Sequence, residues 1–176
     1  SLNDEYVKDY KTKFSNINLN LFDISEYKEL DSFISKNDFD IIFHFAAQTQ
    51  VGDALNNPLR TFKSNIEGTW NLLEICRNKK IPIVIASSDK AYGVSDNLPY
   101  KEDFELKGEF LYEVSKSITD LLSNTYKKTY NHNLVTLRCG NIYGGGDLNW
   151  ERLIPGVIKW LLENKTPVLR SDGSYV

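Results

Sequence analysis

Short apolar runs alternate with longer amphipathic stretches along the chain. The runs predict strands at 17–22, 40–45, 81–87, 134–138 and, more weakly, 167–170. Runs such as IIFHF and IPIVIA are apolar on both faces, which is typical of strands covered by helices on both sides. The alternation predicts an α/β protein with a mostly parallel sheet.

Four stretches have the 3.6-residue spacing of amphipathic helices: 25–36, 58–77, 110–130 and 152–163. Ser25 is placed as the N-cap of the first helix. Gly68 lies inside the second helix, and a glycine there suggests close packing against a neighbouring element. The chain shows no internal repeat, low-complexity tract or linker.

Composition narrows the class of protein. The 176 residues are 41% hydrophobic and carry a net charge of −3, with basic residues in isolated pairs, so a nucleic-acid partner is not expected. Cys76 and Cys139 form no Cys-x-x-Cys or Cys/His cluster, which indicates neither a metal site nor a disulfide scaffold. No apolar run reaches the roughly 18 residues of a membrane span, and residues 1–20 are too polar for a signal peptide. We therefore expect a cytoplasmic protein without a membrane partner.

The glycine-rich turn that opens a nucleotide-binding doubly wound sheet has no counterpart here. The first glycine is Gly52, and neither G-x-G-x-x-G nor a P-loop occurs. The chain opens in a polar stretch and ends at SDGSYV with no further element completed. We expect residues 1–176 to be the central part of one longer α/β domain.

The segment YEVSK, at the start of the third predicted helix, has the sharpest chemical signal. A separation of four places Tyr112 and Lys116 one turn apart on the same helical face. An ammonium beside a phenol stabilises the phenolate, and lowering the phenol pKa from about 10 by about three units takes about 4 kcal/mol of electrostatic help. The pair could then exchange a proton with a sugar hydroxyl near neutral pH. The same spacing also suits a surface pair.

Other polar clusters follow the predicted strands, where open parallel sheets bind ligands. The run SSDKAYG begins at Ser87, and its serines and aspartate suit either a site or a turn that hydrogen-bonds the backbone. In FHFAAQ the two alanines let a ligand approach the backbone, and His44 is expected to be a packed core histidine rather than a metal ligand. After the last central strand, RCGNIYGGGD and Arg152 suit either a phosphate site or a glycine-rich connector with a surface arginine.

The order of these clusters resembles the extended short-chain dehydrogenase/reductase superfamily of nucleotide-sugar epimerases and dehydratases. The succession is HFAAQ, NIEGTWNLLE, SSDKAYG, YEVSK, RCGNIYGGGD and RLIP. Asp89-Lys90 and NIYGGGDLNWERLIP make it most similar to the CDP-glucose 4,6-dehydratase type. The resemblance implies a Rossmann-like doubly wound parallel sheet that is incomplete here, lacking the first βαβ unit and the C-terminal substrate lobe.

The resemblance implies a lyase that uses NAD to remove water from a nucleotide-sugar. Tyr112 would be the base at the C4 hydroxyl as hydride passes from C4 to NAD, and Lys116 would lower its pKa. Ser88 would hydrogen-bond the C4 oxygen, and Asp89 would be the acid that helps the C6 hydroxyl leave. Lys90 stands where many hexose dehydratases have a glutamate as C5 base, so the identity of that base stays open. Hydride returns at C6 to give a 4-keto-6-deoxy sugar.

The resemblance also implies binding residues and a homodimer. The cofactor-binding set is Asp23, Ile24, Phe45, Ala46, Ala47, Gln48, Asn65, Tyr112 and Lys116, with Asp23 reaching the adenine amino group. The substrate-binding set is Ser88, Asn141, Arg152 and Arg170. The alternatives are a nucleotide-sugar 4-epimerase, a non-catalytic dinucleotide-binding protein, and a truncated fragment without activity.

Overall fold

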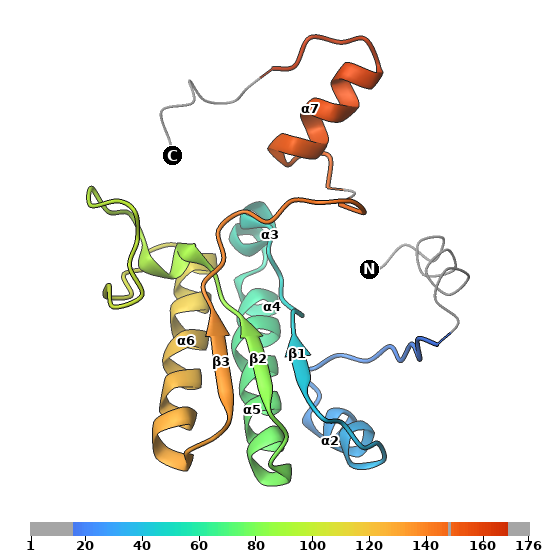
Figure 1. Cartoon of the computed structure of the whole chain (residues 1–176), viewed down its shortest axis with the longest axis vertical. Coiled ribbons are helices and arrows are strands. Elements are labelled where there is room, and N and C mark those ends of the chain that lie inside the picture. The colour runs from blue at the N-terminus through green and yellow to red at the C-terminus, as the bar shows by residue number, and fades with distance from the viewer. Residues whose placement is uncertain (1–15, 148, 169–176) are drawn as a thin grey trace. The chain divides into compact units, whose positions relative to one another are not determined.

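A computed structural model describes residues 16–147 and 149–168 (Figure 1). The chain divides after Arg138 into two compact units, which are described separately. Among the described residues, no helix has the length and hydrophobicity that a membrane crossing needs.

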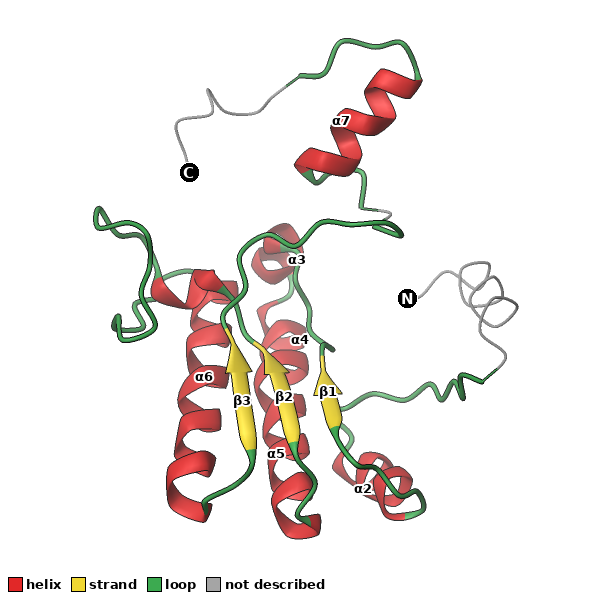
Figure 2. Cartoon of the chain, in the orientation of Figure 1, coloured by secondary structure: helices red, strands yellow, loops and turns green. Residues whose placement is uncertain are grey.

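A parallel sheet of three strands forms the centre of the first unit (Figure 2). Its strands are β1 (Ile42–His44), β2 (Ile83–Ala86) and β3 (Leu134–Leu137), in the order β1-β2-β3. Ile42 pairs with Ile83, and Ile83 pairs with Leu134. Because all three strands run in the same direction, their carboxyl ends meet at one edge of the sheet. The predicted Rossmann-like parallel sheet is confirmed.

The first unit's described helices come before and between the strands in sequence. Helix α2 (Tyr27–Ser35) precedes β1. Between β1 and β2 lie α3 (Val51–Asn56), α4 (Pro58–Phe62), the π-helical turn η1 (Lys63–Glu67) and α5 (Gly68–Lys79), and between β2 and β3 lie the 3₁₀ turn η2 (Asp89–Tyr92) and α6 (Leu111–Tyr130). Helices α5 and α6 pack against each other and run alongside the strands (Figure 1). The main core lies between these helices, α2 and the sheet, with Leu73, Ile75, Ile83 and Ile85 almost fully buried.

The second unit contains α7 (Leu153–Leu162), whose N-cap is Arg152. Gly156 is buried, and a Cβ at this position would lie 2.7 Å from the carbonyl oxygen of Trp150. The side chain of Lys159 lies over the Trp150 ring, 5.6 Å from its centre. These contacts attach the segment before α7 to the helix itself.

The predicted strand at 17–22 is wrong, because the structure has no strand there. A strand needs a neighbour to satisfy its backbone, and these residues pair with no other strand in the described part of the chain. Ile17 and Leu21 are exposed, whereas Phe22 packs against the core, with its ring 5.0 Å from that of Phe33. Pro167 and Val168 are also outside any strand, and 169–170 lie outside the described residues.

Two helix predictions need correction as well. Ser25 is not the N-cap of α2, because Glu26 is; the Ser25 hydroxyl and backbone N–H both donate to Asp23 instead. The helix predicted from 58 to 77 is interrupted by η1. The expectation for Gly68 is confirmed, since a Cβ there would lie 2.6 Å from the side chain of Ile24.

Candidate active site

Lys116 connects α6 to the end of β2. Its Nζ atom donates to the carbonyl oxygen of Ala86, the last residue of β2, at 2.8 Å, and the residue is only 5% exposed. Burial lowers the pKa of Lys116 from 10.5 to about 8, because removal from water penalises the charged form. A cationic group with a depressed pKa therefore lies at the edge of the sheet where ligands bind in this class of fold.

Tyr112 lies in the first turn of α6, one turn before Lys116. The helix begins at Leu111, where the Glu113 carboxylate accepts the backbone N–H of Phe110 at 3.3 Å and so supports the start of the helix. Tyr112 is partly buried, and its carbonyl oxygen accepts a hydrogen bond from Ser115 at 2.7 Å. The helical spacing of the pair is as predicted, and the acid–base role of the phenol stays a prediction.

Ser88 and Asp89 lie in the turn that directly follows β2. The Ser88 hydroxyl donates to Asp89 Oδ1 at 2.9 Å and accepts the backbone N–H of Lys90 at 3.2 Å. Ser117 of α6 donates to the carbonyl oxygen of Ala91 in η2 at 3.0 Å. Helix α6 is therefore bonded both to η2, through Ser117, and to the end of β2, through Lys116. Ser88 therefore caps the turn, as the structural alternative predicted, while its hydroxyl also engages a carboxylate.

Asn65, in the π-helical turn η1, joins the end of β1 to α6. Its amide accepts the backbone N–H of Gln48 at 2.7 Å and donates to the Gln48 carbonyl at 3.0 Å and to Ser115 Oγ at 2.9 Å. Its own carbonyl accepts the hydroxyls of Thr69, at 2.6 Å, and Thr119, at 3.2 Å. π-helical turns often occur at functional sites, and this one fixes the segment that includes Ala46, Ala47 and Gln48.

His44 is a packed core residue, as predicted. It is 5% exposed, and its Nε2 atom lies 2.9 Å from Thr69 Oγ1. The single hydroxyl proton of Thr69 is donated to Asn65, so His44 Nε2–H must be the donor in this pair. Burial, and to a lesser extent the charge of Lys116, lower the pKa of His44 from 6.5 to about 4, which keeps the ring neutral near pH 7.

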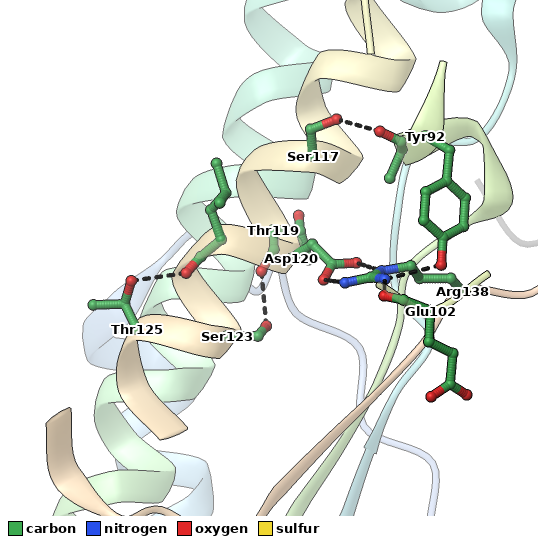
Figure 3. Close-up of polar contacts among 10 residues, drawn as sticks. Tyr92, Glu102, Ser117, Thr119, Asp120, Ser123, Thr125 and Arg138 are labelled. Atoms are coloured by element: carbon green, nitrogen blue, oxygen red, sulfur yellow. Dashed lines mark hydrogen bonds and ion pairs between the residues drawn. The ribbon is translucent and has the colours of Figure 1, made fainter. Parts of the chain in front are cut away.

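Arg138, directly after β3, lies in a polar cluster with Asp120 of α6 and Tyr92, the last residue of η2 (Figure 3). Its guanidinium makes two bonds to Asp120 of α6, at 2.9 and 2.8 Å, and donates to the Tyr92 hydroxyl at 2.9 Å and the Glu102 carbonyl at 2.7 Å. The Tyr92 ring is stacked on Tyr100 at 4.9 Å. The cluster fixes one end of η2. Sequence reasoning missed it, since only the arginine beside a strand end was visible as a signal.

The remaining predicted residues are spread over several segments. Asp23 and Ile24 lie just before α2, and hydrogen bonds from Ser25 lower the pKa of Asp23. Phe45 follows β1 and is 66% exposed.

Of the predicted substrate residues, Ser88 lies in the first unit, and the others follow that unit in the chain. Asn141 and Arg152 belong to the second unit, where Arg152 pairs with Asp147 at 3.0 Å. Arg170 lies outside the described residues. The structure thus brings Ser88, Asp89 and Lys116 to one strand end, and Gln48 and Asn65 to the next.

Comparison with known proteins gives the class. Residues 2–174 match the model of the GDP-mannose 4,6-dehydratase family. The chain therefore belongs to this family, within the NAD-dependent epimerase/dehydratase group of short-chain dehydrogenases/reductases.

Individual relatives include both dehydratases and epimerases. The chain is 30% identical to the CDP-glucose 4,6-dehydratase of Salmonella typhimurium, over 86% of this chain and 46% of the relative. It is 31% identical to the UDP-glucose 4-epimerase of Mycoplasma genitalium, over 87% and 48% respectively. The structure of the dTDP-glucose 4,6-dehydratase of Bacillus anthracis in complex with NAD has a TM-score of 0.81 and 28% identity, with coverage of 97% of this chain and 52% of that one. The chain spans about half the length of these relatives.

The residues at the strand ends fit a dinucleotide such as the NAD bound in that relative. Lys116 offers a cation that would hold ribose hydroxyls, and the two alanines after β1 leave the backbone approachable. Ser87, directly after β2, is 7% exposed and its hydroxyl has no hydrogen-bond partner in the described part of the chain. A buried polar atom without a partner is the kind of group that a bound ligand completes.

Proposed function

We propose that the full-length protein that contains this chain is an NAD-dependent nucleotide-sugar 4,6-dehydratase, a lyase that makes a 4-keto-6-deoxy sugar. The observation that carries the proposal is the hydrogen bond between Ser88 and Asp89 at the end of β2, beside Lys116 of α6. Elimination of water requires an acid near the sugar C6 hydroxyl, whereas inversion at C4 does not. A carboxyl group next to the hydroxyl assigned to the C4 oxygen meets that requirement.

The chain's own residues divide the proton transfers among them. Tyr112 takes the proton of the C4 hydroxyl, and the charge of Lys116 favours the phenolate that does so. Ser88 orients the C4 oxygen, and Asp89 gives a proton to the departing C6 hydroxyl. When bound, NAD supplies reversible oxidation of the sugar and is regenerated in each turnover.

The substrate we propose is a CDP-glucose-like nucleotide-sugar. The support is Lys90, which follows Asp89 as in the CDP-glucose type that the sequence resembles, together with the similarity to the Salmonella enzyme. Asn141, Arg152 and Arg170 are the proposed contacts for the nucleotide-sugar. The C5 base is left unassigned, since Lys90 stands in the position where many relatives have a glutamate.

Product analysis tests the proposal. The full-length protein is incubated with CDP-, UDP-, dTDP- and GDP-linked hexoses. The products are separated, and their masses are measured by mass spectrometry. We expect one of them, CDP-glucose first, to lose the mass of one water. A sugar that keeps its mass while C4 inverts would instead establish the second candidate, a nucleotide-sugar 4-epimerase, which the similarity to the Mycoplasma enzyme favours. In that case Asp89 is a loop residue.

We also propose that the protein is a cytoplasmic homodimer. Both cysteines in the described part of the chain are free thiols, which suits a reducing compartment. Large apolar side chains are exposed on the helices beside the sheet, with Trp70 on α5 54% exposed and Leu121 on α6 56% exposed. Such side chains favour a subunit interface. Sedimentation of the wild type and of Trp70→Glu tests this: the variant is expected to sediment as a monomer.

A further inference from the structure

Ser87 differs from the other buried serines that the structure describes. Ser88, Ser115, Ser117 and Ser123 each donate a hydrogen bond within the chain. The Ser87 hydroxyl is buried and has no hydrogen-bond partner among the described residues, although its backbone N–H donates to the carbonyl oxygen of Leu137 at 2.8 Å. The backbone is therefore held in the sheet while the side chain lacks what a buried hydroxyl requires.

The position of Ser87 indicates what could supply the missing bond. The residue directly follows β2, at the edge where open parallel sheets bind ligands. By the alternation of a strand, its side chain is on the face of Ile83 and Ile85. The preceding carbonyl, that of Ala86, already accepts Lys116 Nζ. The Lys116 ammonium therefore lies at the residue that precedes Ser87, and a ligand that contacts Lys116 also approaches Ser87.

We infer that the Ser87 hydroxyl binds the nicotinamide-ribose half of NAD, through a ribose hydroxyl or the carboxamide. This rests on the proposed NAD-dependent function. A neutral hydroxyl both donates and accepts, which matches ribose hydroxyls and amides, whereas a phosphate calls for cations or several N–H donors. The adenine half is assigned elsewhere, to Asp23 before α2.

Two matched variants of the full-length protein test the inference. Ser87→Ala removes the hydroxyl that has no partner in the described part of the chain, and Ser123→Ala removes another buried hydroxyl, which donates to the carbonyl oxygen of Thr119 at 2.7 Å. Each protein is first stripped of NAD. Its affinity for NAD is then measured by calorimetric titration, and its thermal unfolding is recorded in the NAD-free state. We expect Ser87→Ala to weaken NAD binding about 5- to 10-fold, the value of one hydrogen bond, and to unfold at or above the wild-type temperature. Ser123→Ala should keep its affinity and unfold a few degrees lower.

The NAD affinity and the stability of the two variants together decide whether Ser87 binds NAD. Unchanged NAD affinity in Ser87→Ala overturns the inference, and so does a loss of stability or of folding in Ser87→Ala greater than that in Ser123→Ala, because the hydroxyl would then have a partner inside the protein. If the wild type itself binds no NAD, the proposed function fails and takes this inference with it. Wild-type binding with a selective loss in Ser87→Ala supports both.

Discussion

Replacement of Lys116 by methionine is expected to stabilise the NAD-free protein near neutral pH. The lysine is 5% exposed, and burial lowers its pKa to about 8 from 10.5. That depression means that keeping the ammonium charged inside the protein costs about 3 kcal/mol of folding free energy. Methionine retains an apolar stem and loses the bond to the Ala86 carbonyl, which offsets about 1 kcal/mol. The net gain is about 2 kcal/mol.

The pH dependence of this gain follows from where the proton resides. Between pH 8 and 10.5 the unfolded lysine still holds its proton while the folded one has lost it, so the stability of the wild type rises with pH. Lys116→Met lacks this contribution. The difference in unfolding free energy between variant and wild type should therefore fall by about 3 kcal/mol across that window. Packing effects that do not depend on pH cancel in this comparison.

Urea unfolding of both proteins at several pH values between 7 and 10.5 measures the difference. Lys128→Met, at an exposed position of the same helix, is the matched control for the substitution itself. If the difference in unfolding free energy between Lys116→Met and wild type stays constant over the whole pH range, burial does not depress the pKa of Lys116 as stated. A large loss of stability at pH 7 would also contradict the prediction, because Lys116 would then be held by favourable contacts rather than at a cost.

Three further substitutions in the full-length protein probe other parts of the account. Tyr112→Phe should abolish turnover and leave the unfolding midpoint nearly unchanged, because only the acid–base oxygen is lost; unchanged turnover would mean that the site is misassigned. Asp89→Asn should allow oxidation at C4 but slow elimination, seen by mass spectrometry as accumulated 4-keto-hexose; a proportional loss of both steps contradicts this role. Arg138→Met leaves the Asp120 carboxylate, whose side chain is 4% exposed, without its partner and should lower the unfolding free energy by about 3–5 kcal/mol. Adding Asp120→Asn should recover part of that loss, and a double variant no more stable than the single one would argue against the pair.

The strands and the long helix could be predicted because their signals are local. The runs IIFHF and IPIVIA contain the strands β1 and β2, although Phe43 of β1 is 57% exposed. Helix α6 starts within one residue of the predicted position because its first turn carries its own acidic residue, Glu113. The segment 17–22 has the same apolar signal without a neighbouring strand in the described part of the chain. An apolar run alone does not make a strand, because backbone pairing depends on another segment.

In the candidate site, too, some features could be predicted from the sequence and others could not. The residue types at the strand ends, Ser88 and Asp89 above all, are visible in the sequence, and so is the spacing of Tyr112 and Lys116. The π-helical turn is not, because the Asn65 carbonyl that it presents is held by hydroxyls from two different helices. The Arg138 cluster also joins segments far apart in sequence. Likewise, only the fold reveals that the hydroxyl of Ser87, unlike that of Ser88, has no hydrogen-bond partner within residues 16–147 and 149–168.

We propose that the strand-end residues carry out elimination across C5 and C6 after oxidation at C4. A deuterium label placed at C4 of the nucleotide-linked glucose, and located in the product by NMR, tests this proposal. The account predicts that the label appears at C6 of a 4-keto-6-deoxy sugar. A label that stays at C4 of a sugar with inverted configuration would contradict it.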